Sequence, residues 1–417
     1  MRILLSTLFV LLFVAGFGQA EKAKRYIDTL CTPHFFGRGY THNGVNKAAD
    51  FLKNELEQKG AKPLFGMSFF QAFEHGANIF IDTTSLSITD NELVLGEDFI
   101  PRGSSGSFKG SLPCKNITLP STLDKGYLRN IFHKNPAGQR VLVVDKANLE
   151  NAEQGELMIT MLANSYPLII TGYDKLTWSV ATKNTYFPVF ETLLKEVEDK
   201  QQVKISVTQE QKLFTSKNVA GYIPAQSPSD SFVFVSAHYD HLGGLDGQVY
   251  IPGANDNASG TAMLLDMVDY FKSNPHPKYN IGFLFFAAEE MGLLGSKHYV
   301  DNPSIPLEKT VFLLNLDLMG SGDKGFAVVN GSIFPNWLDK LKGVNEQLPV
   351  PFETIKVRGE AANSDHYWFS RNNVPAFFIY TMGGSSAYHD INDTPDIITL
   401  SRYTEMFDLL TRFMGKI

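Results

Sequence analysis

The chain has 417 residues, of which 43% are hydrophobic and 19% are charged. This length suits two or three domains of ~100–200 residues, and the apolar content excludes a chain that is disordered throughout. The 37 basic and 44 acidic residues give a net charge of −7. No basic run, zinc-knuckle pattern or glycine-rich phosphate loop occurs, so we expect small molecules or peptides as partners and no nucleic acid.

The first twenty residues have the pattern of a secretory signal peptide. Arg2 provides a positive charge, 3–17 is a short apolar run, and 18–20 (Gly-Gln-Ala) offers a cleavage site. The run is shorter than the ~20 residues that span a membrane, and no cysteine at the cleavage point could carry a lipid. We therefore expect a secreted or periplasmic protein with no stable membrane anchor. Cys31 and Cys114 form no disulfide framework and are expected to be free, buried thiols.

The pattern of apolar and polar residues after the signal changes at about Thr83, which divides this segment into a helix and a small module. Residues 45–59 place apolar side chains at helical spacing, and Gly60 follows as a C-cap, so a helix is predicted there. From about Thr83 to Thr215, short alternating runs broken by Gly, Ser and Pro predict a small mixed α/β module without a catalytic cluster. Its strand-like runs are 86–88, 110–112, 141–144 and 168–171, and its one helix-like stretch is 191–197.

From Asn218 onward, strongly apolar strands alternate with helices. The predicted strands are 232–237, 281–288, 311–316 and 376–380, and the helical patterns are 260–271, 335–348 and 401–413. None of the strands alternates polar with apolar residues, so both of their faces should be covered. This order predicts an α/β fold with an open, largely parallel central sheet sandwiched by helices.

Each of these four strands leads to side chains that can bind a metal. In chain order these side chains are His238, Glu289 with Glu290, Asp317 and His389. Open α/β sheets bind their ligands outside the carboxyl ends of the strands. The four groups should therefore meet at one edge of the sheet.

A fifth group, Asp256, lies in the loop PGANDNASG just before a predicted helix. Alone it would suit a turn or a helix cap, but beside the other groups we expect it to be a ligand. Two imidazoles and three carboxylates favour zinc over calcium or magnesium, and they exceed what one catalytic zinc ion uses. The sequence therefore predicts two zinc ions per chain, ~3.5–4 Å apart, bridged by one carboxylate.

The adjacent acids Glu289 and Glu290 should have different roles, because neighbouring side chains that leave a strand point in different directions. One can bind a metal while the other acts as a general base, or one can lie on the surface; spacing does not decide. Asp240 suits a place behind His238, where its carboxylate would accept a hydrogen bond from the imidazole. The alternative for Asp240 is an ordinary turn aspartate.

These residues resemble the co-catalytic di-zinc exopeptidases, which include secreted bacterial leucine aminopeptidases, glutamate carboxypeptidase and glutaminyl cyclases. The matching stretches are AHYDHLG (237–243), PGANDNASG (252–260), FAAEEMGLLGS (286–296), NLDLMG (315–320), SDHYWF (364–369) and YHDINDT (388–394). They cover the chain from about Asn218 to the C-terminus. The resemblance implies a zinc-exopeptidase fold of the phosphorylase/hydrolase-like type.

The resemblance also implies how the metals are shared. Asp256 would bridge the two ions. His238 and Asp317 would complete one site, and Glu290 and His389 would complete the other.

The catalytic roles that the resemblance implies are those of a metallo-aminopeptidase. Glu289 would be the general base, and Asp240 would be the partner behind His238. A zinc-activated water would hydrolyse the N-terminal peptide bond of a peptide whose free α-amino group binds near the metals. Tyr380 and Tyr388 are candidates for the residue that steadies the oxyanion.

The module at 83–215 is similar in position and texture to the protease-associated (PA) domain that many relatives carry inserted here. The stretch NVAGYIP (218–224) resembles the point at which the peptidase chain resumes. The expected organisation is a signal peptide at 1–20, a discontinuous peptidase domain at 21–82 and 216–417, and a PA-like insert at 83–215.

Other functions of the same fold compete with this one. A glutaminyl cyclase would usually depart from the GANDNASG and EEMGLLGS patterns, and an inactive scaffold would have lost ligands that are all present here. A carboxypeptidase or dipeptidase stays open; a preference for acidic C-termini needs a basic pocket, for which Arg358 is the basic residue near the motifs. His241 and His366 are expected to pack and not to bind metal. The sequence does not determine the oligomeric state.

Overall fold

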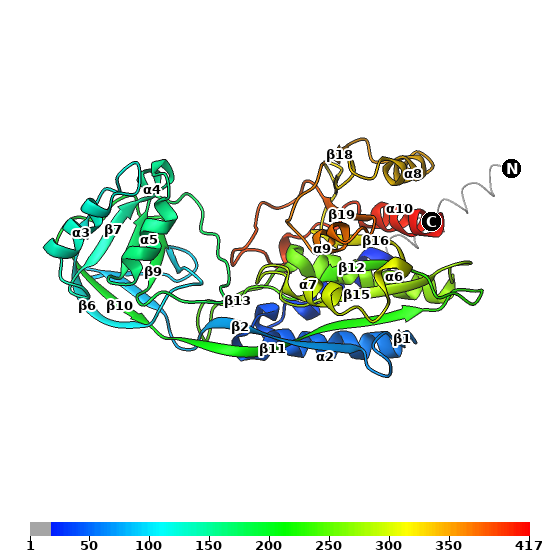
Figure 1. The fold of residues 1–417 in the computed structure, drawn as a ribbon, viewed down its shortest axis with the longest axis horizontal. Coiled ribbons are helices and arrows are strands. Elements are labelled where there is room, and N and C mark those ends of the chain that lie inside the picture. Colours follow the sequence, from blue (N-terminus) through cyan, green and yellow to red (C-terminus); the bar gives the residue numbers. More distant parts are fainter. Residues whose placement is uncertain (1–17) are drawn as a thin grey trace.

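The computed structural model describes residues 18–417, so most of the expected signal peptide lies outside the described residues. The described part begins with a helix at 18–30. Two large sheets, of nine and eight strands, organise the chain, and they lie at opposite ends of an elongated molecule (Figure 1). In residues 18–417, no helix has the length and apolar content needed to cross a membrane.

The nine-stranded sheet has the order β1-β11-β15-β12-β16-β19-β17-β18, with β2 paired to β11. Its strands are β1 (Lys62–Pro63), β2 (Phe70–Phe80), β11 (Gln209–Ile223), β12 (Phe232–His238), β15 (Asn280–Phe286), β16 (Thr310–Asp317), β17 (Phe326–Val329), β18 (Ile355–Val357) and β19 (Ala376–Thr381). The central strands β15, β12, β16 and β19 are parallel, whereas β11 and β17 join them antiparallel. These central strands are the four apolar strands that the sequence predicted, which confirms the α/β class with a mixed sheet.

Helices cover both faces of this sheet. One face carries α2 (Gly44–Gln58), α6 (Gly260–Ser273), α8 (Pro335–Asn345) and α10 (Tyr403–Gly415), and the other carries α7 (Leu294–Asp301) and α9 (His366–Arg371). Alternate side chains of a strand point to opposite faces. Val233 and Val235 of β12 therefore pack in the core with α6, whereas Phe232 and Phe234 pack with α7 and α9. Because both cores are apolar, β12 shows no polar alternation.

The eight-stranded sheet is built from residues 85–207, which we call the inserted module. Its strands run in the order β4-β3-β10-β6-β7-β8-β9-β5. They are β3 (Ser85–Ile88), β4 (Asn91–Leu93), β5 (Phe99–Pro101), β6 (Phe108–Asn116), β7 (Val141–Asp145), β8 (Leu168–Thr171), β9 (Val189–Thr192) and β10 (Gln202–Val207). The helices of the module are α3 (Lys125–Lys134), α4 (Lys146–Asn151) and α5 (Gly155–Ala163).

A long two-stranded ribbon joins the two ends of the molecule. It consists of β2 and β11, which pair antiparallel from Phe80 opposite Gln209 to Phe70 opposite Val219 (Figure 1). The domain boundary expected at residue 215 falls inside β11. The PA-like identity of the inserted module stays a prediction.

Two local expectations from the sequence have clear outcomes. The prediction of a helix at 191–197 is wrong, because β9 occupies 189–192 and residues 193–197 are irregular. Glu191 pairs along β8 and forms an ion pair with Arg102 at 2.7 Å, so pairing within the sheet overrides local helical propensity. Cys31 and Cys114 are both buried and free, as the sequence indicated.

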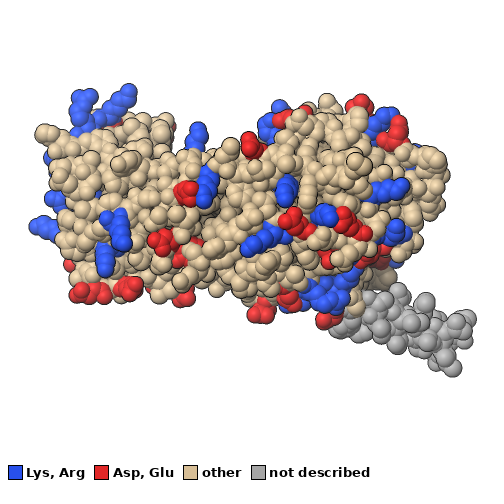
Figure 2. All heavy atoms as spheres, turned by 90° about the horizontal axis from the view of Figure 1, so that it is seen from below, with Lys and Arg blue, Asp and Glu red and all other residues tan. Residues whose placement is uncertain are grey.

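Charged side chains of both signs are interspersed over one face of the molecule (Figure 2). Several charged side chains of the protein pair along helices, such as Lys24 with Asp28 and Lys53 with Glu57. Exposed pairs of this kind contribute only ~0.3–0.5 kcal/mol each. The stability of the fold therefore comes mainly from the buried faces of the two sheets.

Candidate metal centre

The five predicted ligands meet at one edge of the nine-stranded sheet. His238 is the last residue of β12 and Asp317 is the last residue of β16. Glu290 follows β15 after a short turn, and His389 follows β19 after a longer loop. Asp256 comes from the segment Ala254–Ser259, which leads into α6. The parallel order β15-β12-β16-β19 explains the convergence, because it brings the carboxyl ends of these strands together.

Asp256 lies between two imidazoles. Its Oδ1 is 3.3 Å from Nε2 of His238, and its Oδ2 is 3.1 Å from Nε2 of His389. Nε2 of His238 is also 3.4 Å from Oδ2 of Asp317, and Nε2 of His389 is 3.3 Å from Oε2 of Glu290. The five side chains thus form two groups of three donors, and the two groups share Asp256.

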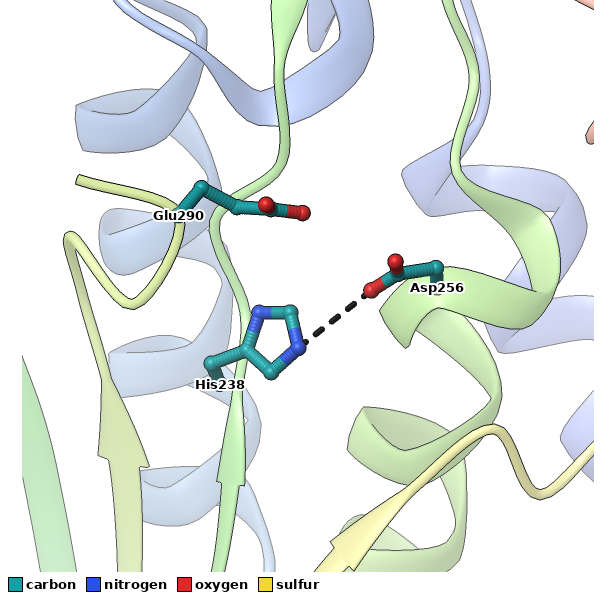
Figure 3. A group of neighbouring side chains, drawn as sticks. All are labelled: His238, Asp256 and Glu290. Carbon is teal, nitrogen blue, oxygen red and sulfur yellow. Dashed lines mark ion pairs between the residues drawn. The ribbon is translucent and has the colours of Figure 1, made fainter. Parts of the chain in front are cut away.

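These separations fit the coordination of metal ions. Donors held ~2.0–2.1 Å from one tetrahedral zinc ion lie ~3.3–3.4 Å from one another. Donor atoms of His238, Asp256 and Glu290 all lie within 4.8 Å of one another, and the side chains face a common space (Figure 3). Oδ1 of Asp317 is buried and has no hydrogen-bond partner among the described residues. The donor set and its spacing therefore suit a metal centre.

Within the protein alone, the centre balances its carboxylates with protons on the imidazoles. Burial opposes a charge on His389, but hydrogen bonds to Asp256 and Glu290 raise its pKa to about 11. The pKa of His238 is likewise raised well above its usual range, despite burial, by the carboxylates around it. Burial raises the pKa of Asp317 to about 6. Metal ions would have to displace these protons in order to bind.

Asp240 lies behind His238, but its contact differs from the prediction. Nδ1 of His238 is 3.1 Å from the backbone carbonyl of Asp240 and 3.7 Å from its Oδ1, so the carbonyl is the acceptor within hydrogen-bond distance. The carboxylate instead accepts hydrogen bonds from the backbone N–H groups of Glu289 (3.2 Å) and Glu290 (3.4 Å). Asp240 therefore orients the His238 ring and also fixes the turn that carries both glutamates.

Glu289, the predicted general base, is next to the predicted ligand Glu290 in this turn. Burial raises its pKa well above the usual range; attraction to His238 opposes this shift, and repulsion from Glu290 and Asp365 adds to it. A carboxyl group with a raised pKa can exchange a proton near neutral pH. Its role as a base stays a prediction.

Arg38 supports the centre, although no pattern in the sequence indicated this role. The side chain is fully buried and donates to backbone carbonyls. Its Nε is 2.8 Å from the carbonyl of Tyr239, its Nη1 is 2.7 Å from that of Pro252, and its Nη2 is 2.7 Å from that of Gly253 and 3.3 Å from that of Asp256. Arg38 thus ties the end of β12 to the loop that carries Asp256.

Two further residues hold the ligands in place. His241 was expected to pack, which is incomplete: its Nδ1 is 2.8 Å from Oε1 of Glu290, so the ring also makes a polar contact with a predicted ligand. The two carboxylate oxygens of Asp393 accept hydrogen bonds from the backbone N–H groups of Asn255 (2.9 Å) and Asp256 (3.1 Å). Asp256 itself caps no helix by a side-chain hydrogen bond, which argues against its alternative role as a cap.

The other side chains singled out in the sequence lie around the centre. His366 is buried, and its ring contacts that of Phe378 with centroids 5.5 Å apart. The ring of Tyr388 stacks on His389 with centroids 4.0 Å apart and remains 47% exposed. The hydroxyl of Tyr380 accepts a hydrogen bond from Nη1 of Arg358 at 3.1 Å.

The fold and the donor set define a candidate metal centre at the edge of an α/β sheet. Residues 218–414 match the model of peptidase family M28. A zinc aminopeptidase from Bacillus subtilis has the same fold, with a TM-score of 0.67 and 21% identity over 95% of this chain and 94% of that chain. The shared fold therefore extends over both sheets.

Two curated relatives match part of the chain. It is 33% identical over 211 residues to the aminopeptidase YwaD of Bacillus subtilis (strain 168), which is 47% of this chain and 44% of that protein. It is also 33% identical over 128 residues to the probable lipoprotein aminopeptidase LpqL of Mycobacterium tuberculosis, which is 30% of this chain and 24% of that protein. The chain thus spans less than half the length of these relatives.

Proposed function

We propose that this protein is an exported zinc-dependent aminopeptidase of family M28. The observation that carries the proposal is the position of Asp256, whose two oxygens face two separate imidazole–carboxylate pairs. The relatives and the solved structure that are named as aminopeptidases support the choice of reaction.

The two groups of donors would hold two zinc ions. His238 and Asp317 would bind one ion, Glu290 and His389 would bind the other, and Asp256 would bridge them. When bound, a pair of zinc ions can lower the pKa of water to ~7 and polarise a carbonyl group. Three ligand carboxylates carry less charge than two zinc ions, so the protein leaves part of the metals' charge available for this chemistry.

The remaining steps fall to the protein's own side chains. Glu289 accepts a proton from the water that attacks the scissile carbonyl and returns it to the leaving amino group. Asp240 keeps Glu289 in reach because its carboxylate binds the backbone of that turn. The guanidinium groups of Arg358 and Arg38, which both lie near the motifs, are already engaged: Arg358 donates to Tyr380, and Arg38 is buried and donates to backbone carbonyls. Neither is free to bind a C-terminal carboxylate, which favours an aminopeptidase over a carboxypeptidase.

Export and domain organisation complete the proposal. The charged and apolar pattern at 1–20 would direct export and be removed, and a relative named as a lipoprotein aminopeptidase supports this localisation. The peptidase domain would comprise 21–82 and 216–417, with a PA-like insert at 83–215. N-terminal sequencing of the protein recovered outside the cytoplasm should begin near Glu21, whereas an intact Met1 would contradict removal of the signal.

Substrate preference and metal content on one sample test the reaction. We expect aminoacyl-p-nitroanilides with a free amino group to be hydrolysed, and a chelator to abolish the activity. Activity only on N-acylated peptides with a free C-terminus would move the assignment to a carboxypeptidase. A metal-free, inactive protein would favour a scaffold.

A further inference from the structure

His389 is the most exposed of the five proposed ligands, so its position depends on contacts from neighbouring segments. Its side chain is 14% exposed, against 1% for His238, 5% for Asp256, 6% for Glu290 and 11% for Asp317. It lies in a loop well beyond the end of β19, and its backbone has a φ of 54°. A non-glycine residue in this left-handed region is strained and persists only where other contacts hold it.

The contacts that hold His389 come from the inserted module. The backbone N–H of Trp178 donates to the carbonyl of His389 at 2.8 Å, and Nδ1 of His389 is 3.0 Å from the carbonyl of Trp178. This pair of contacts fixes the strained backbone and the ring together. Because Nδ1–H is bound to a carbonyl, loss of the other ring proton would leave the lone pair on Nε2, which faces Asp256 and Glu290.

Trp178 is itself firmly anchored. It lies in the loop 172–188 between β8 and β9, and its side chain is buried in an apolar cluster that the inserted module shares with Phe80, Leu242, Leu245 and Ile251. Its indole Nε1 donates to the carbonyl of Pro101 at 2.7 Å, and its ring contacts Phe80 with centroids 5.9 Å apart. The carbonyl that meets His389 therefore has a rigid support.

Lys175, in the same loop, contacts the chain on both sides of His389. Its Nζ is 2.8 Å from the carbonyl of Ser386, 3.3 Å from that of Tyr388 and 2.8 Å from Oδ2 of Asp390. One lysine thus binds residues before and after the ligand. These contacts restrain the loop of His389 without touching its imidazole.

The hydrogen bonds that support the other four ligands have a different origin. Within residues 18–417, they come from outside the inserted module, through residues such as Arg38, Asp240, His241 and Asp393. We propose that the loop 172–188 of the inserted module is a positioning element for His389, and that it sets how tightly the His389–Glu290 group holds its ion. This inference rests on the proposed function, because it requires that group to bind zinc.

Zinc affinity in the full-length protein tests the inference. Lys175→Met removes the three contacts of the lysine, and Asp390→Asn removes its ion pair from the other side. Lys115→Met is the matched control, because Lys115 is a lysine of the same module that is 44% exposed and pairs with Asp199, outside the loop 172–188. Competition with a chromophoric chelator gives a dissociation constant for each bound zinc ion. Circular dichroism of the metal-free variants verifies their folding.

We expect Lys175→Met and Asp390→Asn to weaken the affinity for one of the two zinc ions about threefold to tenfold, and Lys115→Met to change neither affinity. Unchanged constants in both variants would overturn the inference. An equal loss of affinity for both zinc ions would also overturn the inference, because such a loss would show that the fold as a whole is destabilised. A wild-type protein that binds no zinc would instead refute the proposed function itself, so the two failures are distinguishable.

Discussion

Replacing Arg38 by methionine tests whether this side chain holds the metal-binding loop. Methionine keeps an unbranched apolar stem of similar reach but removes every donor. Three of the lost hydrogen bonds are 2.7–2.8 Å long and come from a charged group. Such bonds contribute ~1.5–3 kcal/mol each, and we take the lower value because burying the guanidinium also costs free energy. The expected loss in the free energy of unfolding is therefore ~4–5 kcal/mol.

The assay is urea unfolding of the metal-free protein, followed by far-ultraviolet circular dichroism. The loss should appear in the transition of the nine-stranded sheet, because the bonds of Arg38 lie at its edge. Arg129→Met is the control, since Arg129 is exposed on α3 of the inserted module and its loss should change stability by less than ~0.5 kcal/mol. Arg38→Lys keeps the charge with fewer donors and should lie between the two.

The zinc affinity of the Arg38→Met protein should fall as well, because the loop 252–256 loses its attachment to the end of β12. If the free energy of unfolding of Arg38→Met lay within ~1 kcal/mol of the wild-type value, the reasoning would be refuted. Such a result would mean that the carbonyls of Tyr239, Pro252 and Gly253 find other donors once the guanidinium is gone.

Three further predictions concern the centre itself. Glu289→Gln should keep both zinc ions and lower kcat at least ~100-fold, the usual effect of losing a general base, and a near-normal kcat would reject this role. His241→Phe should weaken zinc binding ~10–100-fold in a competition titration, and His241→Gln, which keeps an N–H donor, should weaken it less; equal affinities would show that the contact with Glu290 is dispensable. Zinc binding at pH 7 should release protons, because the pKa of about 11 at His389 leaves an imidazolium to be displaced, so affinity should fall as pH falls. Calorimetry in two buffers of different ionisation enthalpy measures this release, and its absence would contradict the proton balance.

The sequence predicted which side chains converge, because the candidate ligands follow a simple rule of topology. Four apolar strands each end near an imidazole or a carboxylate, and parallel order brings those ends together. His238 and Asp317 are the last residues of their strands, so their places required no knowledge of the loops. His389 was found through its motif, since nothing local shows how its long loop returns to the centre.

The supporting contacts could not be predicted, because they join segments that are remote in sequence. Arg38 lies 215 residues before Gly253, and Trp178 lies 211 residues before His389. In both cases a backbone carbonyl or N–H takes part, and these groups are present in every residue and leave no compositional signal. The same reason explains Asp240, where the carbonyl and not the carboxylate meets the imidazole. Only the path of the chain decides which of the two oxygens is in reach.

The most direct test of this account is the number of zinc ions bound per chain in the wild type and in Asp256→Ala. Both proteins would be loaded with zinc, freed of excess metal and analysed for metal and protein content on the same folded sample. Because Asp256 is shared by both groups of donors, we predict two ions in the wild type and the loss of both in the variant. One ion in the wild type, or a variant that still holds two, would contradict the shared centre.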